Sequence, residues 1–121
     1  MQLSEMSFSD ATPIDSYGPG FFRVGGAIIE GGALIHRDGA SVWQGLDDSA
    51  ALVALAGKID VVLLGMGDEI APVPSALREA LQEVGIGIEP MKTPTACRTY
   101  NVLLAEGRRV AAALVPMPVE S

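Results

Sequence analysis

The chain has 121 residues, of which 49% are hydrophobic and 19% are charged; this is typical of one globular domain and excludes a disordered chain. Eight basic and fifteen acidic residues give a net charge of −7, which disfavours nucleic acid and anionic membranes as partners. The single cysteine, the absence of basic residues from positions 1–10 and the shortness of all apolar runs predict a cytoplasmic protein without a targeting segment or a membrane span.

The first part of the chain predicts an antiparallel meander. Short runs of β-forming residues at 21–24, 27–29 and 33–35 are separated by Gly-Gly pairs. Because glycine supplies the positive φ that tight hairpin turns require, we expect three consecutive antiparallel strands. The turn-forming segment 13–20 before them is expected to hold a short edge strand around Ile14. The large aromatic side chains form either an exposed face or, as we favour, the core of the meander: Tyr17, Phe21, Phe22 and Trp43.

The second part of the chain, from Asp47 onward, alternates helical and strand patterns. Apolar residues at a helical period, with capping residues before them and glycine after them, predict helices that end at Gly57, Gly85 and Gly107. The last of these helices is expected to begin at Thr93–Thr95. Apolar runs predict the intervening strands at 59–64, 86–89 and 109–115.

This order of elements predicts the fold class. Strand, helix, strand, helix, strand at such spacing indicates two right-handed βαβ crossovers with parallel strands. We therefore expect a single α/β domain over residues 1–121, with a mixed β-sheet, an antiparallel N-terminal meander, two βαβ crossovers and about three helices. Its core is expected at about 14–116, and residues 1–12 and 117–121 are expected to be flexible.

The loops at 65–69 and 90–95 are the candidate functional region, because ligands of open parallel sheets bind beyond the carboxyl ends of the strands. The first loop lacks the third glycine of a dinucleotide fingerprint, since Ile70 stands there, and its acidic residues would repel a pyrophosphate. We expect no cofactor. The glycines either permit a sharp turn with close packing, which we favour, or belong to a ligand site. On the second interpretation, the candidates in this loop are Gly65, Gly67 and Asp68.

The second loop leads into the helix that carries the remaining ligand candidates: Thr93, Thr95, Arg98 and Asn101. A cation in the first turn of a helix opposes the helix dipole by roughly 0.3–1 kcal/mol. Arg98 therefore either forms an ion pair, with Asp68 or Glu69 as the expected partner, or completes an anion site. We favour the ion pair, because the crossover topology brings the acidic loop to the same edge of the sheet.

Other chemical motifs are weak. Cys97 would have a lowered pKa if it were exposed at the start of the helix, but its place on the apolar stripe favours a buried position. His36 is the only histidine, and no nucleophile elbow accompanies it. One cysteine and one histidine exclude a structural zinc site, and we expect no metal. Asp47 and Asp48 are best explained as helix-capping residues. No catalytic residue can be assigned, and we favour a protein that is not an enzyme.

Three stretches, in this order and spacing, resemble a known family: 14–24 (IDSYGPGFFRV), 63–67 (LLGMG) and 91–110 (MKTPTACRTYNVLLAEGRRV). The family consists of small, largely uncharacterised α/β proteins, and it includes mitochondrial complex I assembly factor 3 and an adipogenesis-associated protein of the same domain type. The similarity extends over about 14–116, and the last stretch is the most specific. The resemblance implies a single α/β domain with a mixed sheet, and it implies no established reaction.

Two functions follow as hypotheses. The first is a non-enzymatic, assembly-factor-like protein that binds a protein partner and is linked to the maturation of a respiratory complex. Its contact surface is expected near Met66, Met91 and the segment 116–118, since flexible thioethers adapt to partner surfaces. The alternative is a small-molecule or anion-binding enzyme, with its site at the carboxyl edge of the strands near Thr95–Arg98.

Overall fold

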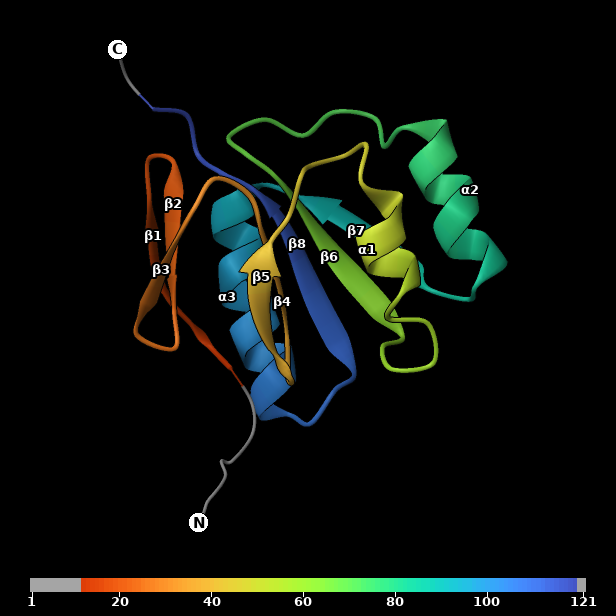
Figure 1. The fold of residues 1–121 in the computed structure, drawn as a ribbon, viewed down its shortest axis with the longest axis horizontal. Coiled ribbons are helices and arrows are strands. Elements are labelled where there is room, and N and C mark those ends of the chain that lie inside the picture. Colours follow the sequence, from red (N-terminus) through yellow and green to blue (C-terminus); the bar gives the residue numbers. More distant parts are fainter. Residues whose placement is uncertain (1–11, 120–121) are drawn as a thin grey trace.

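A five-stranded mixed sheet forms the centre of the protein in the computed structural model, which describes residues 12–119. The three parallel strands lie together, and two antiparallel strands extend the sheet on one side (Figure 1). In spatial order the strands are β5 (Gly39–Val42), β4 (Ala33–His36), β8 (Val110–Val115), β6 (Val61–Met66) and β7 (Gly87–Met91). The predicted parallel strands are thus confirmed as neighbours.

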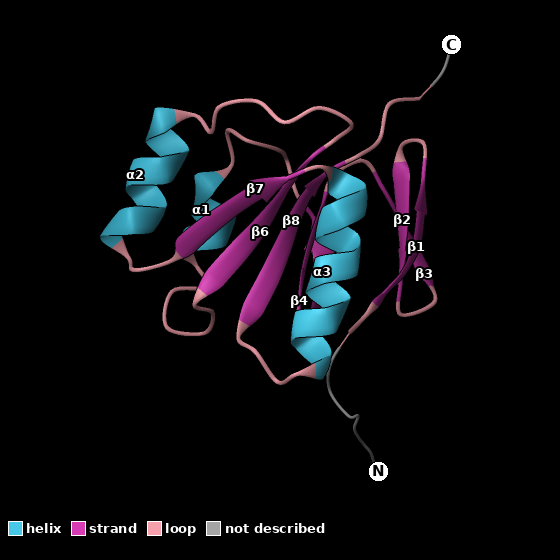
Figure 2. Ribbon diagram, turned by 180° about the vertical axis from the view of Figure 1, so that it is seen from behind, coloured by secondary structure: helices cyan, strands magenta, loops and turns pink. Residues whose placement is uncertain are grey.

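Three helices cover this sheet. Helices α1 (Ser49–Val53) and α2 (Ser75–Glu83) pack on one face, and α3 (Thr93–Ala105) packs on the other (Figure 2). Asp48 caps α1, because its carboxylate accepts a hydrogen bond from the Ala51 N–H at 3.4 Å, as the capping interpretation predicts. Among the described residues, no helix has the length and apolar character needed to cross a membrane.

The central strands alternate between two hydrophobic cores. Along β6, Val62 and Leu64 face the core under α1 and α2, whereas Leu63 faces the core under α3. Such period-two alternation with apolar residues on both faces is what a strand covered on both sides requires. The core on the α3 side continues onto a second, smaller sheet through the fully buried Phe22.

That smaller sheet is a three-stranded antiparallel meander of β1 (Ile14–Gly18), β2 (Phe21–Val24) and β3 (Ala27–Glu30). It stands beside α3 at the end of the molecule away from α2 (Figures 1 and 2). The fold class is therefore confirmed as a single α/β domain with antiparallel N-terminal strands, a mixed sheet and three helices.

Two details of the expected meander are wrong. The run at 33–35 does not pair with the run before it; it forms β4 of the central sheet, between β5 and β8. The reason lies at the Gly31–Gly32 pair, where the chain passes from the small sheet to the central sheet instead of closing a hairpin. A Cβ on Gly32 would lie 2.5 Å from the Trp43 carbonyl oxygen, so this close approach is open only to glycine. Strand β5 was not expected. It is a strand of 4 residues that are mostly exposed.

The ends of the chain are only partly described. Residues 1–11 and 120–121, where we expected flexibility, lie outside the described residues. Met117, which we placed in the flexible C-terminal end, accepts a hydrogen bond from the Gly20 N–H at 2.9 Å. The anchored part of the chain therefore extends at least to Met117.

Gly107 ends α3 with a φ of 78°, a conformation that is favourable for glycine and costly for other residues. We predict that Gly107→Ala lowers the free energy of unfolding, measured with urea, by about 1 kcal/mol. The added Cβ would meet nothing within 4 Å, so the cost is that of the backbone alone. The matched control is Gly87→Ala, where φ is ordinary and the nearest atom lies at 3.6 Å. Equal stability of the two variants would contradict the assignment of the helix end.

Candidate functional site

Thr93 occupies the carboxyl edge of the parallel strands, where the sequence predicts a ligand. Its side chain is fully buried. The hydroxyl donates a hydrogen bond to the Val115 carbonyl oxygen at 2.7 Å and accepts one from the Gly67 N–H at 2.8 Å. The Thr93 N–H donates to the Gly67 carbonyl oxygen at 2.9 Å. Thr93 therefore joins the ends of β6 and β8 to the start of α3.

Gly65 and Gly67 serve this junction. A Cβ on Gly65 would lie 3.0 Å from the Thr93 hydroxyl oxygen and 2.8 Å from Leu114, so only glycine lets α3 approach β6 this closely. Gly67 has a φ of 79°, which turns the chain back toward Thr93. The geometry agrees with the favoured interpretation, in which both glycines provide a sharp turn and close packing. Whether they also touch a ligand stays a prediction.

Asn101, another ligand candidate, binds the backbone of β1. Its Oδ1 accepts a hydrogen bond from the Ile14 N–H at 2.9 Å, and its Nδ2 donates to the Ile14 carbonyl oxygen at 2.8 Å. One side chain thus satisfies both polar groups of a residue at the start of the small sheet. On the same helix, the Tyr100 hydroxyl donates to the Thr12 carbonyl oxygen at 3.2 Å. These bonds hold the small sheet against α3.

The expected ion pair of Arg98 is wrong. Within residues 12–119, the one ion pair joins Arg109 to Asp60 at 3.3 Å, and Arg98 is exposed. The physical reason is the turn at Gly67, which fixes the backbone to Thr93 and directs Asp68 into a different hollow from the one that Arg98 lines. Thr95, in the same first turn of α3, is exposed.

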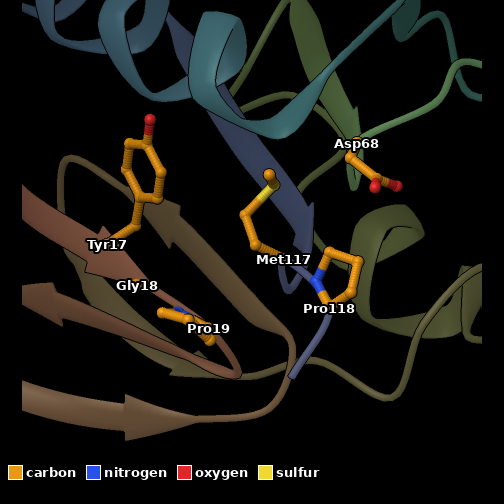
Figure 3. Close-up of a pocket in the computed structure, with 6 residues that line it drawn as sticks. All are labelled: Tyr17, Gly18, Pro19, Asp68, Met117 and Pro118. Carbon is orange, nitrogen blue, oxygen red and sulfur yellow. The ribbon is translucent and has the colours of Figure 1, made fainter. Parts of the chain in front are cut away.

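Two adjoining hollows border the small sheet: one lies at the seam between the β1–β2 turn and the carboxyl edge of the central sheet, and the other lies between β1 and α3. The larger has a volume of about 330 Å³ and is lined by Tyr17, Gly18, Pro19, Asp68, Met117 and Pro118. The smaller, about 140 Å³, is lined by Ile14, Asp15, Ser16, Tyr17, Cys97, Arg98 and Asn101. Tyr17 belongs to both. In the larger hollow, Tyr17 and Asp68 lie on opposite sides of Met117 (Figure 3).

Sequence reasoning placed some of these side chains incorrectly. Of the aromatic residues expected in the core of the meander, Phe22 is buried there, whereas Trp43 is buried in the core under α1 and α2. Phe21 is half-buried, and Tyr17 is 38% exposed and lines both hollows. Met66, expected on a contact surface, is a core residue, and Met91 packs against the core below α3. Met117 lines the larger hollow. The sequence features that could have located the larger hollow are the turn residues at 18–20 and the Pro-Met-Pro segment at 116–118.

Cys97 and His36 show the effects of burial. Burial raises the pKa of the Cys97 thiol to about 11, with Arg98 opposing the shift, so the thiol is protonated near neutral pH. The buried position matches the favoured interpretation. Partial burial lowers the pKa of His36, against the raising effect of Asp38. The His36 Nδ1 accepts a hydrogen bond from the Asp38 N–H at 3.3 Å.

Comparison with known proteins places this architecture in a family. Residues 14–115 match the model of a family described as proteins of unknown function (DUF498/DUF598). An uncharacterized protein of Rhodobacter capsulatus is 57% identical over 118 residues, which cover 98% of this chain and 95% of the relative. Human NADH dehydrogenase (ubiquinone) 1 alpha subcomplex assembly factor 3 is 31% identical over 125 residues, which cover 98% of this chain and 68% of that protein. These matches confirm the resemblance seen in the sequence.

A solved structure agrees. The crystal structure of an outer membrane protein from Bartonella henselae is similar, with a TM-score of 0.81 and 35% identity, over 91% of this chain and 98% of the other. The likeness therefore includes both the central sheet and the small sheet.

The junction at Thr93 predicts a stability effect. Thr93→Val keeps the shape of the side chain but leaves the Gly67 N–H and the Val115 carbonyl without their partner. We expect a loss of about 2–3 kcal/mol in the free energy of unfolding, measured with urea. Thr95→Val, an exposed position in the same turn, is the control and should change stability by less than about 0.5 kcal/mol. Equal effects of the two substitutions would contradict the structural role of Thr93.

Proposed function

The chain belongs to the DUF498/DUF598 family, and from that premise we propose that it is a non-enzymatic binding protein that assists the maturation of a respiratory complex in the cytoplasm. The observation that supports this is the likeness to human assembly factor 3, which extends over 98% of this chain. The shared region covers 68% of the human protein, and the proposal assigns the partner-binding function to this shared part.

The chemistry of the carboxyl edge supports a binding role. Thr93 and Asn101, the buried and half-buried polar side chains offered there, use their polar atoms on the protein's own backbone. The accessible groups nearby include Tyr17, Met117 and Pro118. An aromatic ring, a thioether and a proline are residue types that suit contact with another protein. We place the partner contact at this seam.

Anion binding at Thr95 and Arg98 is the second candidate. It is favoured by Arg98, which is exposed, lines the smaller hollow and forms no ion pair within the described residues. If it is right, titration with inorganic phosphate should shift the amide resonances of residues 95–98 in a saturable manner, and Arg98→Gln should abolish the shifts. Unchanged resonances in the unmodified chain at tens of millimolar phosphate would eliminate this candidate.

Deletion of the gene in the encoding organism tests the proposed function. Membranes from the deletion strain should oxidise NADH more slowly and should contain less fully assembled NADH dehydrogenase on native gels, with recovery when the wild-type chain is returned. Succinate oxidation in the same membranes is the control and should not change. Normal levels of assembled NADH dehydrogenase in the deletion strain would refute the proposal.

A further inference from the structure

We propose that the larger hollow binds a basic side chain, lysine or arginine, presented by a partner protein. This inference rests on the proposed binding function and specifies the chemistry of the partner. The hollow combines the Asp68 carboxylate, the Tyr17 ring and the apolar side chains of Met117 and Pro118. Asp68 and Tyr17 lie on opposite sides of Met117, and Pro118 lies next to Met117 (Figure 3).

Asp68 supplies the negative charge. It is exposed and forms no ion pair within residues 12–119. Its backbone is held in place, because the preceding residue, Gly67, exchanges two hydrogen bonds with Thr93, at 2.8 and 2.9 Å. Binding of a cation therefore restricts only the Asp68 side chain, since its backbone is already held. Asp68 is thus available to a cation from outside the described part of the chain.

Tyr17 and Met117 supply the rest of the site. The Tyr17 ring is 38% exposed and lies across Met117 from Asp68 (Figure 3), so it offers apolar surface to the aliphatic stem of a side chain whose charged end lies at Asp68. The aliphatic stem of lysine or arginine packs on apolar surface while its charged end stays in a polar environment. Met117, which lies between Tyr17 and Asp68, and the neighbouring Pro118 offer such a surface (Figure 3). A basic side chain therefore matches each part of the lining.

The walls of the hollow are held together. Pro19 pairs with Met117 in parallel register, and the Gly20 N–H donates a hydrogen bond to the Met117 carbonyl oxygen at 2.9 Å. Gly20 approaches Val119 so closely that a Cβ on it would lie 2.7 Å from that side chain. The segment after β8 is thus tied to the β1–β2 turn, and the site exists before the partner arrives.

Charge selects a basic occupant over the others. An apolar side chain would remove water from the Asp68 carboxylate without replacing its hydrogen bonds, which is costly. An acidic side chain would face that carboxylate and a chain of net charge −7. A basic segment would instead be steered toward this surface, with an association rate that falls as salt rises.

The test is an amide chemical-shift titration of the full chain with two capped tripeptides, acetyl-Gly-Arg-Gly-amide and acetyl-Gly-Lys-Gly-amide. The neutral control is the same peptide with citrulline, which retains the shape of arginine without its charge. We expect saturable shifts at Gly18, Asp68 and Met117, and an affinity for the basic peptides at least about threefold above that for citrulline, the scale of an exposed ion pair. Equal affinity for arginine and citrulline would overturn the proposal.

Two matched variants locate the site. Asp68→Asn should lower the affinity for the basic peptides about threefold to fivefold, whereas Glu69→Gln, which removes the neighbouring exposed carboxylate, should change it less than twofold. Unchanged amide resonances far from the hollow verify that both variants are folded. Equal losses in the two variants would show a diffuse acidic surface and contradict a specific hollow.

The same variants separate this inference from the proposed function. If the deletion strain has a defect and Asp68→Asn restores assembly as well as the wild-type chain does, the proposed function stands and this inference is wrong. If the deletion strain has no defect, the proposed function is wrong, and the peptide titration still decides whether the hollow binds basic side chains.

Discussion

The Thr93 hydroxyl is the contact on which the carboxyl edge of this sheet depends. It donates to the end of β8 and accepts from the turn after β6, and the backbone N–H of the same residue bonds to that turn. The start of α3 and two strand ends therefore share one buried group. Open parallel sheets usually leave this edge free for a ligand. Here the Thr93 hydroxyl, the Gly67 N–H and the Val115 carbonyl oxygen are paired with one another.

Because the polar groups of the Thr93 junction are paired, the accessible side chains lie away from it, along the small sheet. Asn101 ties β1 to α3, and Met117 ties the end of the chain to the β1–β2 turn. The small sheet is thereby fixed beside α3 and the central sheet. The larger hollow forms at the seam between the β1–β2 turn and the carboxyl edge of the central sheet, and the smaller forms between β1 and α3. Their lining comes from residues far apart in the sequence, so the seam exists only when both sheets are in place. A binding surface built in this way needs no mobile loop to form.

Local patterns predicted the elements better than their pairing. Prolines at the start and glycines after the end were sufficient to place α2 and α3, because helix ends depend on nearby residues. Neither helix has a side-chain hydrogen bond at its N-cap. The run at 33–35 was identified as a strand, but its transfer to the central sheet depends on how closely Gly32 approaches the backbone of Trp43, which is a property of the folded chain. The extension of β6 to Met66 likewise depends on its pairing with β8.

The structure assigns structural contacts to two of the predicted ligand candidates, and their role in ligand binding stays a prediction. Thr93 and Asn101 have the residue types of ligand-binding groups, and no local signal distinguishes a side chain that binds a ligand from one that binds backbone 22 or 87 positions away. Tyr17 was expected in the core because aromatic residues usually are. Native-state hydrogen exchange of the Gly67 and Thr93 amides tests the closed edge most directly. If the edge is closed, both amides exchange only through global unfolding, at the rate of the central strands. If either amide exchanges orders of magnitude faster than the amides of β6, the carboxyl edge is open, and the structural role of Thr93 is contradicted.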